Sequence, residues 1–123
     1  MAMGPNARPV TALGDIENPQ FALLRYTVSS GTVTVVKAPA GWSLGNFSSG
    51  IAALTFPKHY AEMFPFTGQE NTTNASATSR HKLETKTIDV AAGTASVVCT
   101  DDNDGTVENP VDGTFRLLYL VGN

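Results

Sequence analysis

The sequence has too few cysteines for an internal disulfide or for a zinc site built from cysteines, because the chain of 123 residues contains one cysteine, Cys99. A lone thiol cannot form an internal disulfide, and a cysteine-based zinc site needs several thiols. Cys99 lies in the run 95–100, among small and β-branched residues. We therefore expect a small buried hydrophobe rather than a reactive thiol.

Charged residues are also scarce, at 15% of the chain against about 25% in an average globular protein. The eight Lys and Arg residues are scattered along a chain whose formal net charge is −3. Binding to nucleic acid or to an anionic membrane surface requires clustered basic residues. The sequence therefore predicts neither partner.

Long apolar runs are absent. No stretch could span a membrane, and the first residues lack the apolar core of a signal peptide. We expect the protein to be made and folded in a cytoplasm. Residues 1–19 contain Pro5, Pro9 and Pro19, which disfavour helix in the residues before them. This segment is predicted to be an extended N-terminal arm, either a loose terminus or a strap that orders on a partner.

Recognisable catalytic sets are missing as well. The two histidines, His59 and His81, have no partner at metal-ligand spacing along the chain. Carboxylate pairs or a Ser-His-Asp set could be chosen from the acidic residues, but no nucleophile motif or glycine-rich phosphate loop accompanies them. We predict that the protein is not an enzyme and that it uses no cofactor.

The densest acidic group is Asp101-Asp102-Asn103-Asp104-Gly105. Oxygen ligands beside a glycine can hold calcium, but the spacing differs from that of the helix-loop-helix calcium site. Asn, Asp and Gly also supply the left-handed backbone of tight turns. We favour a solvated hairpin loop and predict no metal site.

The chain does contain many short segments with alternating side chains, separated by turn residues. These segments are 20–29, 32–36, 42–47, 51–56, 80–90, 94–100 and 114–121. A period of two is typical of half-buried strands, and strands at intervals of about eight to twelve residues are typical of sandwiches and barrels. We predict an all-β fold, an antiparallel β-sandwich or jelly-roll-like barrel, formed by residues 20–123 as a single domain.

Several positions within this fold can be assigned. The segment 114–121 is the most hydrophobic and is expected to be central, with alternate residues from Phe115 to Val121 lining one face. Trp42 is expected to point inward. Residues 58–66 are compatible with a helical turn or a strand, and residues 67–78 predict a polar surface loop. Phe64-Pro65-Phe66 lies beside that loop and is the best candidate for an exposed aromatic patch.

Two parts of the chain resemble proteins of tailed bacteriophages. The segment Gly41-Trp42-Ser43-Leu44, followed by residues 49–58 with their Thr-Phe-Pro ending, resembles a hairpin of phage structural proteins. The C-terminal Asp104-Gly105-Thr106, the run 109–114 and the hydrophobic last strand are similar to the ends of small phage head and tail proteins. This resemblance covers most of residues 30–122 and implies a structural component of a virion, with no functional residue carried over.

The sequence thus predicts a virion structural protein, assembled in the host cytoplasm, and in particular a capsid decoration or cement protein. Such a protein would bridge major capsid subunits by buried surface, and a homotrimer is expected. The residues assigned to partner contacts are Pro5, Arg8, Pro9, Val10, Phe64 and Phe66. The alternative is a tail-fibre or baseplate module that binds a receptor or carbohydrate through its Thr- and Asn-rich loops and its exposed aromatics.

Overall fold

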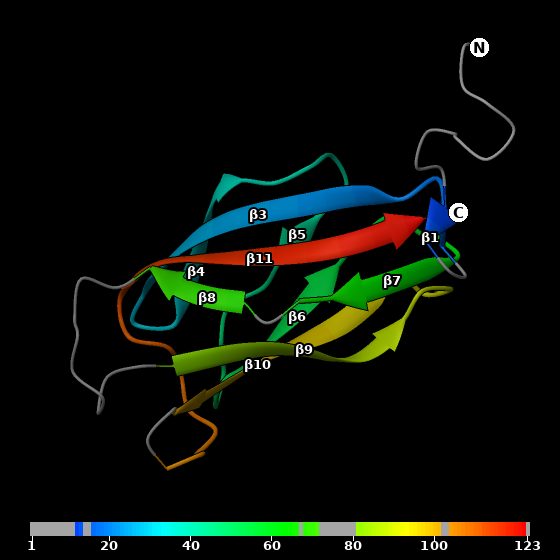
Figure 1. The fold of residues 1–123 in the computed structure, drawn as a ribbon. Coiled ribbons are helices and arrows are strands. Elements are labelled where there is room, and N and C mark those ends of the chain that lie inside the picture. The colour runs from blue at the N-terminus through cyan, green and yellow to red at the C-terminus, as the bar shows by residue number, and fades with distance from the viewer. Residues whose placement is uncertain (1–11, 14–15, 67, 72–80, 102–103, 123) are drawn as a thin grey trace, which may run out of the picture.

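The structure is a computed structural model that describes residues 12–13, 16–66, 68–71, 81–101 and 104–122 (Figure 1). The elements assigned in these ranges are all strands. In chain order they are β1 (Ala12–Leu13), β2 (Ile16–Glu17), β3 (Gln20–Ser29), β4 (Thr32–Lys37), β5 (Ser43–Leu44), β6 (Ile51–Thr55), β7 (Glu62–Pro65), β8 (Gly68–Asn71), β9 (His81–Asp89), β10 (Thr94–Asp101) and β11 (Gly113–Gly122).

The strands form two packed antiparallel layers, which confirms the predicted β-sandwich. One layer has the order β4-β3-β11, with β7 and β8 following each other along the free edge of β11. The other layer has the order β9-β10-β6-β5. β8 pairs with both β11 and β9, so it connects the two layers through hydrogen bonds (Figure 1).

Side-chain alternation explains why the longest strands form where they do. In β3 every second residue from Ala22 to Val28 is buried, while Phe21, Leu23 and Arg25 point to the solvent. In β11 the residues Phe115, Leu117, Tyr119 and Val121 are buried, and the strand lies between β3 and β7/β8. Both the inward face and the central position of this strand are as predicted.

The first hairpin closes with the backbone that its turn residues favour. Ser30 has a φ of 50° and Gly31 a φ of 79°, and Ser29 faces Thr32 across the turn. Positive φ at both central residues matches the right-handed twist of the flanking strands. The turn at Ser30-Gly31 therefore fixes the register of β3 against β4.

Aromatic rings fill the space between the layers. The centroid of the Trp42 ring lies 5.3 Å from that of Tyr119 and 5.4 Å from that of Phe56. Trp42 is buried, as predicted, and so is Cys99. The Tyr26 and Phe115 rings stack with centroids 5.7 Å apart. The core thus joins residues from both layers.

The predicted polar loop over residues 67–78 is wrong in its first part, because Gly68–Asn71 forms β8. β7 covers only the half of β11 from Tyr119 to Gly122. The backbone groups of the other half need partners too, and β8 supplies them between Thr114 and Arg116. Residues 72–78 lie outside the described residues. The ambiguous segment 58–66 contains a strand, β7, rather than a helical turn.

Side-chain alternation along β9 is interrupted after Thr85. Leu83 is buried, but Thr87 adopts a φ of 55° and the register against β10 shifts between Thr94 and Ser96. A bulge of this kind reverses which residues face inward. Ile88 therefore packs against the core, and Val90 does so as well.

Part of the predicted arm is described. Ala12–Leu13 pairs with Ile16–Glu17 in a small two-stranded sheet, and β2 contacts β11. The structure does not describe residues 1–11.

Two buried tyrosines differ in how their hydroxyl groups are satisfied. The Tyr119 hydroxyl lies 2.5 Å from Thr85 Oγ1, whereas the buried Tyr26 hydroxyl has no hydrogen-bond partner among the described residues. An unpaired buried hydroxyl costs free energy that a phenylalanine ring avoids. We expect Tyr26→Phe to raise the free energy of unfolding by about 1 kcal/mol and Tyr119→Phe to lower it by about 1 kcal/mol, measured by urea denaturation at neutral pH. A Tyr26→Phe protein less stable than the parent would contradict this assignment.

Alkaline pH should destabilise the fold through the same two side chains. Burial raises the pKa of Tyr26 to about 12 and raises the pKa of Tyr119 further, partly opposed by its hydrogen bond with Thr85. In the unfolded chain a tyrosine ionises near pH 10. The stabilising contribution is therefore complete below about pH 10 and is lost as the pH rises toward 12. Thermal unfolding between pH 9 and about pH 11.5 should show this loss, and Tyr26→Phe should reduce its slope.

Candidate interaction surface

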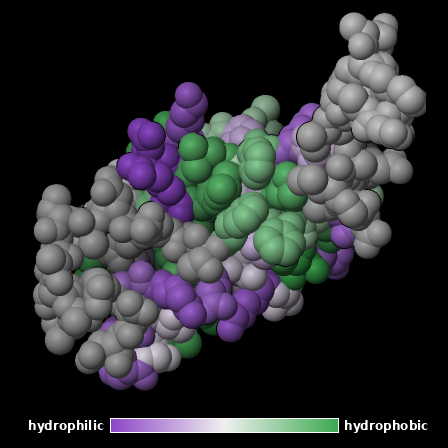
Figure 2. Space-filling view, in the orientation of Figure 1, coloured by the Kyte–Doolittle hydropathy of each residue, from purple (hydrophilic) through white to green (hydrophobic). Residues whose placement is uncertain are grey.

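The most distinctive surface lies on the outer side of β3, β11 and β7. Of the eight large hydrophobic side chains exposed in the described part of the chain, four gather here: Phe21, Leu23, Phe64 and Phe66. Together with the partly buried Leu118 and the buried Leu120 of β11, which lie between them, we call this set the apolar face. Figure 2 shows it as a green area over these three strands.

Strand register arranges the apolar face in two rows across the sheet. In the first row, Leu120 of β11 lies opposite Phe21 on one side and Phe64 on the other. In the second row, Leu118 lies opposite Leu23, and its carbonyl accepts a hydrogen bond of 3.0 Å from the Phe66 N–H. Side chains that are far apart in sequence thus become neighbours.

The exposure of this face is comparable to that of the largest apolar patch on a monomeric protein. Phe21 is 67% exposed, Phe64 53%, Leu23 52% and Phe66 38%. These four side chains present on the order of 400 Å² of apolar area, within the range of the largest and often functional patches of monomeric proteins. The Phe66 ring centroid lies 5.3 Å from that of Phe64 and 6.4 Å from that of Phe21, so the rings form one cluster.

A row of cations borders the apolar face. Arg25 of β3 lies opposite Arg116 of β11 on one side and Lys37 of β4 on the other. Like charges on directly opposed strand positions repel each other. Within the described ranges none of the three forms an ion pair with an acidic side chain. A pocket of about 160 Å³ lies between Leu23, Arg25 and Lys37. We call these three cations the basic row.

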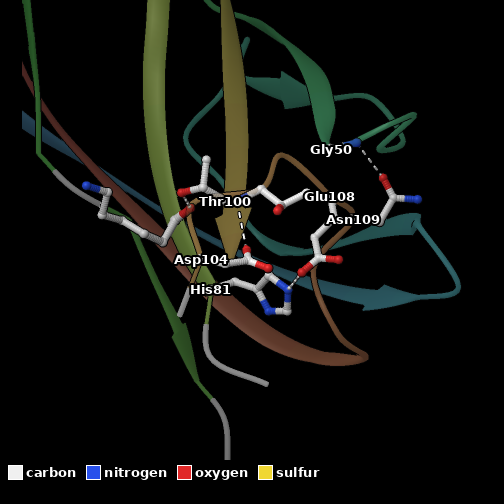
Figure 3. Close-up of polar contacts among 8 residues, drawn as sticks. Gly50, His81, Thr100, Asp104, Glu108 and Asn109 are labelled. Atoms are coloured by element: carbon white, nitrogen blue, oxygen red, sulfur yellow. Dashed lines mark hydrogen bonds and ion pairs between the residues drawn. The ribbon is translucent and has the colours of Figure 1, made fainter. Parts of the chain in front are cut away.

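A different cluster forms in the second layer, where β9 begins and β10 ends. Donor atoms of His81, Asp101 and Glu108 all lie within 4.8 Å of one another. Figure 3 shows His81 and Glu108 pointing toward each other, with His81 Nε2 3.4 Å from Glu108 Oε1. Nitrogen and oxygen donors of this kind could hold a divalent cation. The contact between His81 and Glu108 serves equally as an ion pair within the fold, so the cluster alone assigns no metal.

The loop before β11 is built to hold two hairpin turns. The Asn109 side chain accepts a hydrogen bond of 2.7 Å from the Gly50 N–H (Figure 3), and Asp112 accepts one of 2.7 Å from the Ser30 N–H. Earlier in the same loop, Asp104 accepts a bond of 2.9 Å from the Thr106 N–H. These carboxylate and amide groups are therefore occupied in organising turns, in line with the predicted hairpin loop.

The residues predicted from the sequence fall into two groups. Phe64 and Phe66 are exposed and lie together, as expected of an aromatic patch. The four predicted arm contacts, Pro5, Arg8, Pro9 and Val10, lie outside the described residues. Sequence reasoning missed Phe21 and Leu23, although the first half of the segment 20–29 is apolar on both of its faces, which is a visible signal. A groove exposing both Trp42 and Phe64 would have favoured the glycan-binding alternative, but Trp42 is buried.

Comparisons with known proteins add no identification. The chain matches no protein-family model, no curated protein and no solved structure. The described residues also include no helix long and apolar enough to cross a membrane.

Leu23 and Leu24 offer a matched test of the two sides of β3. Leu23 is 52% exposed on the apolar face, whereas Leu24 is fully buried in the core. We expect Leu24→Ala to lower the free energy of unfolding by about 2–5 kcal/mol and Leu23→Ala to change it by about 0.5 kcal/mol or less. Denaturant titration of the two variants decides this. A large loss with Leu23→Ala would mean that the apolar face is part of the core.

Proposed function

We propose that this chain is a non-catalytic structural protein of a virus particle, in which it holds neighbouring subunits together through the apolar face. The observation that carries the proposal is the clustering of Phe21, Leu23, Phe64 and Phe66 on one outer sheet surface. A solvated face of an antiparallel sheet is normally polar. Apolar rows on that face therefore favour burial against another protein.

The way the face is built suits a structural contact. Phe21, Leu23 and Phe64 lie on strands, and the opposite sides of β3 and β11 are locked into the core. Side chains held on such a scaffold lose little conformational freedom on association, which lowers the free-energy cost of binding. A cement protein needs this kind of contact, because it holds subunits together by buried surface area and not by a chemical reaction.

The virion setting rests on the resemblance of residues 41–44 and 49–58, and of the C-terminal segments 104–106, 109–114 and 117–121, to phage structural proteins. In a decoration or cement protein, the apolar face would bury surface against a neighbouring subunit on the outside of the capsid, and a second copy of the decoration protein is one such neighbour. The capsid would then resist heat better with the protein than without it.

The test uses the virus that encodes the chain, carrying either Phe21→Ser with Phe64→Ser or the control Ile51→Ser. Ile51 is 46% exposed on β6, in the other layer, so its loss removes a similar surface group outside the apolar face. We expect mass spectrometry to find the parent and the Ile51→Ser protein in purified particles. Particles of the double variant should lose infectivity at a lower temperature than these two. Absence of the parent protein from purified particles would refute the virion assignment.

A further inference from the structure

The outer face of the β3-β11-β7 layer is polar at both ends, with opposite charges. β7 contributes Glu62, which lies opposite Gly122 at one end of the apolar face. The next residue, Met63, packs against the core, so Glu62 and Phe64 both point outward. At the other end lies the basic row. Along the strand direction the face therefore runs from an acid, through two apolar rows, to cations.

The spacing of these four rows is regular. Residues on the same side of a strand recur about every 7 Å. Glu62, the Phe64 row, the Leu118 row and the basic row therefore lie at equal steps along the sheet. The midpoint of the series falls between the two apolar rows.

We propose that the apolar face is covered by the same face of a second copy of this chain, related by a two-fold axis that crosses the strands between the two apolar rows. This inference rests on the proposed function and names the partner of its contact surface, with a dimer in place of the homotrimer expected from the sequence. Rotation about this axis places apolar row on apolar row. It also brings Glu62 of each copy to the basic row of the other, where Arg116 is the cation on the strand next to β7.

Charge favours this axis over a two-fold axis that runs parallel to the strands. A two-fold axis parallel to the strands would place the basic row of one copy on the basic row of the other. The like charges of Lys37, Arg25 and Arg116 would then be doubled in a partly desolvated contact, which is unfavourable. The axis across the strands instead supplies each basic row with a carboxylate. A self-complementary surface of this kind is what an isologous dimer requires.

The area available fits a dimer of moderate affinity. The four exposed apolar side chains present on the order of 400 Å², about half of the roughly 800 Å² that each partner contributes to a standard interface. Apolar atoms normally make up somewhat more than half of such an interface. Glu62 and the basic row provide the polar rim. We expect a dissociation constant in the micromolar range.

Nucleic acid is the competing occupant of a surface with neighbouring Arg and Lys side chains. Two features favour the protein partner. The chain carries a net charge of −3, and the basic row adjoins apolar side chains that a phosphate backbone would not cover. Binding of a single-stranded DNA oligonucleotide at physiological salt that is lost in Arg25→Glu would therefore overturn the proposal.

The test is sedimentation velocity of the purified full chain from about 1 to about 200 µM. The parent should pass from monomer to a species of twice the 13.0 kDa chain mass. Glu62→Arg, Arg116→Glu and Phe64→Ser should each weaken dimerisation at least about tenfold. The control Val107→Ser, at a residue 45% exposed outside the face, should leave dimerisation unchanged. Circular dichroism and thermal unfolding check that each variant is folded.

Mixing the charge variants gives the sharper result. At a concentration where the parent dimerises, Glu62→Arg and Arg116→Glu proteins should each be monomeric alone. They should form a heterodimer when mixed, because one of its two Glu–Arg contacts is then native and the other is restored with reversed sign. Non-specific apolar association would not show this rescue. A parent that stays monomeric at every concentration, a trimer, or the absence of rescue would overturn the two-fold pairing. None of these results bears on the detection of the protein in virions, so the two proposals fail independently.

Discussion

The pairing of β11 with its neighbours on both edges is the constraint on which the rest of the structure depends. β11 pairs with β3 from Gly113 to Val121, and its other edge is shared by β7 and β8. Its inward side chains form the centre of the core, while Arg116, Leu118 and Leu120 form the centre of the outer face. A shift of one residue in this register would exchange the two sets. Core and interaction surface are therefore determined by the same backbone hydrogen bonds.

The sequence within one segment was sufficient to predict a strand whose bounds depend on that segment alone. The bounds of β3 match the predicted segment, because the strand ends in a turn with left-handed residues. β8 could not be predicted in this way. Its sequence is polar, and it becomes a strand because the long β11 needs a partner for its first half. The bulge at Thr87 is similar, since a positive φ at a threonine has no local signature.

For the same reason, only part of the candidate interaction surface could be predicted from the sequence. Phe64 and Phe66 could be recognised from two aromatics beside a polar stretch. Their proximity to Phe21 and Leu23 depends on cross-strand register, which alternation within one segment does not specify. The basic residues likewise appear scattered along the chain, yet Lys37, Arg25 and Arg116 occupy adjacent positions on three strands. His81, Asp101 and Glu108 come together in the same nonlocal way.

The outer face is also where the sequence departs from what the fold itself requires. The core would be equally well formed with polar residues at Phe21, Leu23 and Phe64, because their side chains point away from it. Opposed cations on three neighbouring strands reduce the stability of the isolated chain, and exposed aromatic rings reduce its solubility. Natural sequences keep such local conflicts at functional sites, where a partner relieves them. An apolar surface with a carboxylate opposite the basic row would relieve both conflicts at once, and in the proposed two-fold pairing Glu62 of the second copy would supply that carboxylate.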